Sequence, residues 1–185
     1  DLLDKTLSFL SKYIVFSKAE IKDISNELFC YGNDSAQNKH MSVQAIDNGL
    51  EIHLGNRKEL WLNKKESKKE MDIKDWTDLE IELLHSWISS ENSQLFLPQS
   101  LNYHEIDALD FEKGCYLGQE IIARMHFRGK LKKKLHLINN PVVELTDGVL
   151  VSQGRKKTLA ILRNTTDQPI EVVSKENTRV LAQPI

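Results

Sequence analysis

Short runs of β-forming residues, spaced regularly, fill the last third of the sequence and restrict most strongly what this chain can fold into. The runs begin at Leu131 and continue to the last residue. The turn signals that separate them are Asn139-Asn140-Pro141, Asp147-Gly148, Gly154 and Asp167-Gln168-Pro169. Several short strands within about 55 residues are typical of a small β-barrel or sandwich. We therefore expect a C-terminal β-barrel or sandwich over residues 129–185.

Two segments before this region have the spacing of helices. Over residues 2–14, leucine and isoleucine recur every three to four positions, which predicts an amphipathic helix. A second helix is predicted over 77–88, because Thr77 and Glu80 fit a capping box. The apolar stripe of that helix includes Trp76 and continues at helical spacing. These helices and the strand-like segments between them are the elements of the α+β domain that we expect over residues 1–128.

Strand-like segments lie between these helices. The predicted extended segments are 19–21, 27–31, 50–54, 59–62 and 95–99. Turns or loops are predicted at Gly32-Asn33-Asp34, 33–40, Asp47-Asn48-Gly49 and Gly55-Asn56. The charged run 64–70 has no apolar face, so we expect a solvated linker or helix surface there.

Charge and cysteine content exclude several classes of protein. The 25 Lys and Arg residues nearly balance the 27 Asp and Glu residues, which leaves a net charge of −2 and no global attraction for nucleic acid. Direct nucleic-acid binding is therefore not expected. No apolar run reaches the roughly 18 residues of a membrane-spanning helix. Two cysteines cannot form a disulfide framework, and no signal peptide is visible, so we expect a cytoplasmic protein.

A cysteine between two glycines is the main candidate for chemistry. Cys115 follows Lys113 and Gly114, in a predicted tight turn just before a helix over 117–124. That position and the lysine favour the thiolate form of a cysteine. The alternative is a small buried cysteine, which is the usual fate of a free thiol. No histidine is paired with this cysteine by the sequence, and no Cys-x-x-Cys spacing indicates zinc, so no metal site is expected.

Basic residues follow this cysteine. The helix over 117–124 is expected to bury Ile121 and Ile122. The basic residues in and after it are Arg124, Arg128, Lys130, Lys132, Lys133 and Lys134. They are consistent with a solvated strand edge, where lysines discourage pairing between sheets. The alternative is a site for an anionic ligand, such as a polyglutamate tail or an RNA backbone.

Residues 113–120, Lys-Gly-Cys-Tyr-Leu-Gly-Gln-Glu, resemble the Lys-Gly-Cys-Tyr-x-Gly-Gln-Glu signature of the YgfZ family. This family comprises folate-binding proteins related to the aminomethyltransferase (T-protein) of the glycine cleavage system. The residues that match at and after the signature are Lys113, Gly114, Cys115, Tyr116, Gly118, Gln119, Glu120, Arg124 and Arg128. Residues 76–82 and 96–102 resemble two further elements of the family, in the same order along the chain.

The resemblance implies a fold and a ligand. It implies part of an aminomethyltransferase-like α+β domain with ferredoxin-like elements, followed by the β-barrel, and it implies that an N-terminal part is absent. Tetrahydrofolate or a derivative is the implied cofactor. Trp76 matches a tryptophan that lines the folate site, where an indole can stack on a flat ring. Glu82 matches an acidic position that contacts the pterin in the T-protein relatives, and a carboxylate can accept paired hydrogen bonds from such a ring.

The resemblance also implies a role. Members of the family are thought to support assembly or repair of iron–sulfur clusters and, through iron–sulfur enzymes, tRNA modification. In that setting Cys115 is a candidate reactive thiol, and iron–sulfur enzymes are candidate partners. An auxiliary folate-binding factor is the leading interpretation, and a folate-dependent aminomethyl transferase is the alternative. The proposed catalytic aspartate of the T-protein relatives lies in the segment that this chain lacks.

Overall fold

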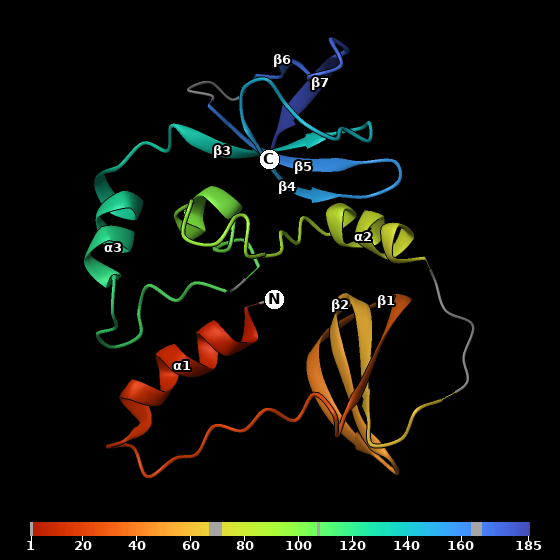
Figure 1. The fold of residues 1–185 in the computed structure, drawn as a ribbon, viewed down its shortest axis with the longest axis vertical. Coiled ribbons are helices and arrows are strands. Elements are labelled where there is room, and N and C mark those ends of the chain that lie inside the picture. The colour runs from red at the N-terminus through yellow and green to blue at the C-terminus, as the bar shows by residue number, and fades with distance from the viewer. Residues whose placement is uncertain (1, 67–71, 107, 164–167) are drawn as a thin grey trace. The chain divides into compact units, whose positions relative to one another are not determined.

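The computed structural model describes residues 2–66, 72–106, 108–163 and 168–185. The chain forms two compact units, Asp1–Glu70 and Met71–Ile185 (Figure 1). The mixture of helices and antiparallel sheets confirms the α+β expectation. The domain boundary expected between residues 128 and 129 stays a prediction.

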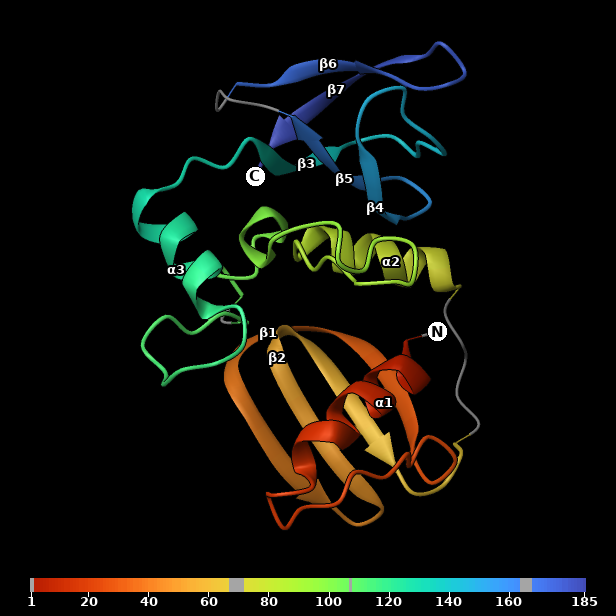
Figure 2. The ribbon, with the colours of Figure 1, turned by 60° about the vertical axis from the view of Figure 1, so that its left-hand side comes forward.

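The first unit consists of a helix and a long β-hairpin. The helix α1, Leu3–Ile14, confirms the helix expected over residues 2–14. The strands β1, Phe29–Ile46, and β2, Gly49–Leu62, pair antiparallel and curl strongly (Figure 2). The turn expected at 47–49 is confirmed, because two residues join the strands there. The curl brings the two ends of β2 together, so a Cβ atom on Gly49 would lie 2.0 Å from the carbonyl oxygen of Trp61.

Several turns expected in this unit are wrong. The backbone of β1 runs through the loop expected at 33–40, and β2 runs through the turn expected at 55–56. Two register shifts, between Asp34 and Lys39 and between Lys39 and Ser42, take up the extra residues of β1. Pairing with a neighbouring strand overrides local turn propensity here. The strand expected at 19–21 is also wrong, since that segment pairs with nothing in the described two-stranded sheet.

The second unit is built on a five-stranded antiparallel sheet. Its strands are β3 (Lys133–Ile138), β4 (Val149–Gln153), β5 (Thr158–Arg163), β6 (Ile170–Val173) and β7 (Arg179–Pro184). Their order is β4-β5-β3-β7-β6. The expected β structure is confirmed, but the strand pairing among the described residues leaves an open sheet rather than a closed barrel. One isolated bridge, from Leu145 to Ser174, joins the segment before β4 to the residue after β6.

Both faces of strand β5, which lies between β4 and β3, are buried. Ala160 and Leu162 belong to a core that the curved sheet forms with its own connections. Leu159 and Ile161 belong to a second core, on the face that the helical segment 73–101 covers (Figure 1). Five consecutive residues of β5 are buried, which accounts for its continuous apolar sequence.

The helical segment of this unit differs in its bounds from the sequence prediction. The helix α2 spans Ile73–Glu82 rather than 77–88, because Asp72 caps it by accepting a hydrogen bond from the amide of Lys74 (2.8 Å). The expected capping box at Thr77 is wrong, since its hydroxyl donates to the carbonyl of Ile73 inside the helix. Leu84 has a positive φ of 58°, which ends the helix.

Two shorter helical elements follow. The 3₁₀ helix η1, Pro98–Leu101, takes the last two residues of the extended segment expected at 95–99, and Leu97 is extended before the proline. The helix α3 spans Gln119–Arg128 rather than 117–124. None of the helices in the described part of the chain is long and apolar enough to cross a membrane.

Candidate functional site

The signature segment 113–120 forms an exposed loop that leads into α3. Asp110 organises its start, because one carboxylate oxygen accepts hydrogen bonds from the amides of Glu112 (2.8 Å) and Lys113 (3.1 Å). The loop ends at Gly118, whose φ of 88° is a left-handed conformation that favours glycine. Gly114 does not share this positive φ, although a Cβ atom on either glycine would meet nothing within 4 Å.

Interactions within the loop hold its residues together. The ammonium of Lys113 lies 4.6 Å from the ring centroid of Tyr116, a cation–π contact. The side chain of Gln119 donates to the carbonyl of Lys113 (3.5 Å), and its backbone amide donates to the carbonyl of Tyr116 (3.2 Å). Glu120 pairs with Arg124 one turn later on α3 (2.8 Å). The signature therefore forms a local unit of structure.

Cys115 is exposed at the outer part of this loop. It lies three residues before Gly118, so it precedes α3 by more than the immediate position expected. Its exposure fits an accessible thiol and does not fit the alternative of a small buried cysteine. A reagent or partner can reach it directly in this unit.

The helix α3 is more exposed than expected. Ile121 is 60% exposed, so the expectation that it is buried is wrong; its neighbour Ile122 is half-buried. Arg124 and Arg128 are also exposed. Contact with η1 fixes the helix on one side, where the side chain of Gln99 donates to the carbonyl of Ile122 (2.7 Å).

The two candidate folate residues lie on α2, apart from the signature loop. Trp76 is half-buried in the middle of the helix. Glu82 is the last residue of the helix, and its carboxylate pairs with the ammonium of Lys157 (2.8 Å) while its side chain stays 53% exposed. Six residues separate the two, so they lie about 120° apart around the helix axis. The helix thus presents an indole and a carboxylate on different faces.

An acidic side chain that sequence reasoning missed lies between them. Asp78 is 8% exposed and accepts hydrogen bonds from the backbone amides of Arg155, Lys156 and Lys157 at 3.0–3.1 Å. These amides form the turn between β4 and β5. The signal available in the sequence was the pairing of acidic residues in 72–82 with the basic turn 155–157.

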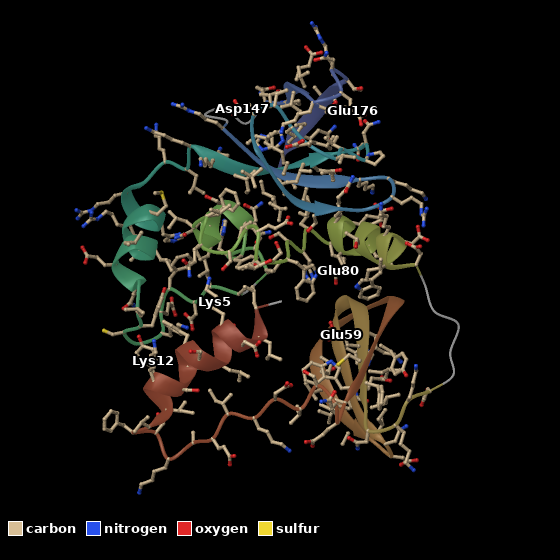
Figure 3. All side chains as sticks on the ribbon, viewed as in Figure 1. Lys5, Lys12, Glu59, Glu80, Asp147 and Glu176 are labelled. Carbon is tan, nitrogen blue, oxygen red and sulfur yellow. The ribbon has the colours of Figure 1, made fainter. Side chains whose placement is uncertain are left out.

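Other acidic residues in α2 and at its N-cap have different interactions. Asp72 and Asp75 bind the guanidinium of Arg155 at 3.2 and 2.8 Å. Glu80, which Figure 3 labels on α2, is 2% exposed. Among the residues that the structure describes, no group of three or more His, Cys, Asp or Glu side chains is arranged to hold a metal ion.

Comparison with known proteins places these features in a family. The chain is 31% identical to the tRNA-modifying protein YgfZ of Serratia proteamaculans, over 73% of this chain and 48% of that protein. It is 30% identical to the protein of the same name from Blochmanniella pennsylvanica, over 75% of this chain and 50% of that protein. The chain belongs to the YgfZ family. No family model matches the sequence.

The comparison also shows how much of the length of its YgfZ relatives this chain covers. A third YgfZ relative, from Buchnera aphidicola, is 30% identical over 71% of this chain and 49% of that protein. The chain spans about half the length of the curated YgfZ relatives it matches.

Proposed function

We propose that this chain belongs to a folate-binding protein that supports iron–sulfur enzymes and, through them, tRNA modification. The observation that carries the proposal is the signature loop of a YgfZ-type chain, internally bonded and with the Cys115 thiol exposed. The curated relatives are named tRNA-modifying proteins, which supports the last part of the role. For the whole protein we propose the aminomethyltransferase-like fold.

The residues of α2 suit a tetrahydrofolate-type ligand. The indole of Trp76 is half-buried, so one face can stack on a pterin or aminobenzoyl ring. Glu82 is exposed and would accept hydrogen bonds from the aminopyrimidinone edge. Lys157 holds one oxygen of that carboxylate and would orient it toward the ligand. When bound, such a folate supplies a carrier for one-carbon units.

Calorimetric titration of the full-length protein with tetrahydrofolate tests the ligand. We expect saturable binding that weakens at least tenfold in Trp76→Ala and several-fold in Glu82→Gln. Trp87→Ala is the matched control, because Trp87 is 57% exposed and lies after the end of α2. Absence of binding, or equal losses in both tryptophan variants, would contradict the folate role.

A cellular assay tests the thiol. Cys115→Ser in the full-length protein should lower the activity of an iron–sulfur enzyme that modifies tRNA, together with the amount of modified nucleoside. Cys30→Ser, which changes the other cysteine of this chain, should leave both at the wild-type level. If Cys115→Ser also leaves both unchanged, the thiol has no part in the role.

A further inference from the structure

A cleft of about 250 Å³ lies between η1 and the end of α3 in the second unit. Its lining includes Gln99 and His104 from the helical segment, and Met125 and His126 from α3. Lys134, the second residue of β3, also lines the cleft. The volume suits a single heterocyclic base, and the described residues that line the cleft include no Asp or Glu. A simple cation therefore has no carboxylate to bind there.

Gln99 contributes an acceptor without a partner. The residue is 3% exposed, and its side-chain nitrogen donates to the carbonyl of Ile122 at 2.7 Å. That bond fixes which end of the amide carries the oxygen. The oxygen, Oε1, is buried and has no hydrogen-bond partner in the structure. A buried acceptor left unpaired costs about 1–3 kcal/mol, so a ligand that donates to it gains that contribution.

His104 contributes a second acceptor. Its Nε2 atom lies 3.4 Å from a carboxylate oxygen of Glu105, which favours a proton on Nε2. In that tautomer the other ring nitrogen, Nδ1, carries a lone pair. Nδ1 is buried and has no partner in the structure. The two unpaired acceptors thus belong to residues that line one cleft.

The complementary ligand donates two hydrogen bonds and accepts one. Gln99 and His104 require N–H donors, and the ammonium of Lys134 can donate to a carbonyl oxygen in the same cleft. The Watson–Crick edge of guanine has this pattern, with a ring N–H, an exocyclic amino group and a carbonyl oxygen. Adenine presents an amino group beside a ring acceptor, so it leaves one protein acceptor unpaired.

Aromatic and basic groups beside the cleft suit the rest of a nucleotide. His126, which lines the cleft, stacks on Phe111 with ring centroids 3.9 Å apart and an angle of 22°. Phe127 is 73% exposed next to this stack. Arg128 and Lys130 are exposed and can approach a phosphate. Aromatic faces and cations together are typical of sites for unpaired bases.

We propose that this cleft binds the guanine base of a nucleotide, with Gln99 and His104 accepting from its donor edge. Base recognition through hydrogen bonds needs no positive net charge, so the net charge of −2 does not oppose it. The proposal is independent of the folate site on α2.

Met125 lines the same cleft as the two acceptor residues. Its sulfur packs against Gly129, where a Cβ atom would lie 2.3 Å from Sδ. Because methionine is unbranched and flexible, a change of rotamer can open the cleft without moving the backbone. Base binding therefore involves movement of this side chain.

Calorimetric titration of the full-length protein with GMP tests the proposal, with AMP as the matched ligand. We expect GMP to bind at least tenfold more tightly than AMP. His104→Ala and Gln99→Met should each weaken GMP binding at least fivefold, whereas Gln183→Met, an exposed control, should not. Equal affinities for GMP and AMP, or unchanged GMP binding in His104→Ala, would overturn the proposal.

A spectroscopic measurement does not depend on the stability of these variants. The ¹³C-methyl resonance of Met125, assigned through Met125→Leu, should shift on addition of GMP and not of AMP. If GMP leaves that resonance in place, the base does not enter the cleft.

Two further titrations test whether the bound ring comes from a nucleotide in RNA or from a pterin. A short single-stranded RNA with one guanine should bind as GMP does, and its adenine counterpart should bind more weakly. A pterin ring has the same donor edge as guanine, so 5-formyltetrahydrofolate is added as a competitor. Displacement of GMP by this folate at a lower concentration than unlabelled GMP requires would overturn the nucleotide assignment.

Discussion

A Cβ atom on Gly154 would lie 2.0 Å from a carboxylate oxygen of Asp78. The glycine therefore lets the turn between β4 and β5 close over that carboxylate. Three successive amides of the same turn then donate to Asp78. A glycine and an aspartate about 76 residues apart in the chain thus join α2 to the edge of the sheet.

Gly154→Ala should destabilise the protein because the new methyl group collides with Asp78. The carboxylate cannot move away without losing its amide donors, so we expect a loss of about 1–3 kcal/mol in the free energy of unfolding. Urea denaturation measures it. Gly114→Ala is the control, since nothing lies within 4 Å of its Cβ position and no change of comparable size is expected. Equal effects in the two variants would contradict this account.

Asp78→Asn should lower stability by about 2 kcal/mol, because an amide group presents a donor to backbone amides that need an acceptor. Thermal unfolding of the two variants Asp78→Asn and Asp75→Asn gives the comparison. Asp75 binds Arg155 at an exposed position, where an ion pair contributes at most about 1 kcal/mol. A larger loss for Asp75→Asn than for Asp78→Asn would show that the ion pair, not the turn, holds α2.

Stability should fall as the pH is lowered from 7.5 to 5, because of His136. Burial in β3 lowers the pKa of this histidine below its ordinary value of 6.5, and the nearby charge of Lys134 lowers it further, against a raising contribution from the backbone contact with Lys134. The unfolded chain therefore binds the proton first, so stability is complete above pH 6.5 and is lost as the pH falls through the folded pKa.

The pH profile of urea denaturation measures this loss. His136→Gln should flatten the profile over this range. The carboxylate of Glu51, whose pKa is lowered chiefly by its hydrogen bond to Lys58, contributes only at more acidic pH. An unchanged slope in His136→Gln would assign the effect to another group.

The two cysteines should differ in their rates of alkylation at pH 8. Partial burial and the charge of Glu59 raise the pKa of the Cys30 thiol, which lowers its thiolate fraction. Glu59 lies on β2 (Figure 3), and Glu59→Gln removes that charge. Mass spectrometry should show Cys30 reacting faster in Glu59→Gln than in the wild type. Cys115 serves as the internal control, because its rate should not change.

Local patterns predicted elements where few long-range contacts compete with them. The helix α1 and the turn at 47–49 depend on local spacing and turn chemistry, and both are confirmed. The continuous strands at 33–40 and 55–56 depend on pairing between β1 and β2, which no local pattern indicates. The start of α2 depended on Asp72 rather than Thr77, since both residues are plausible caps and only packing of the helix decides between them.

In the candidate site too, local features could be predicted and features that depend on distant residues could not. The exposed signature loop could be located from its residues, because its contacts are local. Burial of Asp78 and the unpaired oxygen of Gln99 could not, since each depends on backbone groups supplied from elsewhere in the fold. The exposure of Ile121 likewise follows from what α3 packs against, which composition does not reveal.

The strand β5 has a consequence for how the second unit melts. Its residues alternate between two cores, with Leu159 and Ile161 on one face and Ala160 and Leu162 on the other. Neither core can open without exposing part of the same strand to water, so the free energies of the two are coupled. We therefore expect the helical segment and the sheet to unfold cooperatively, as one thermodynamic unit with a single transition.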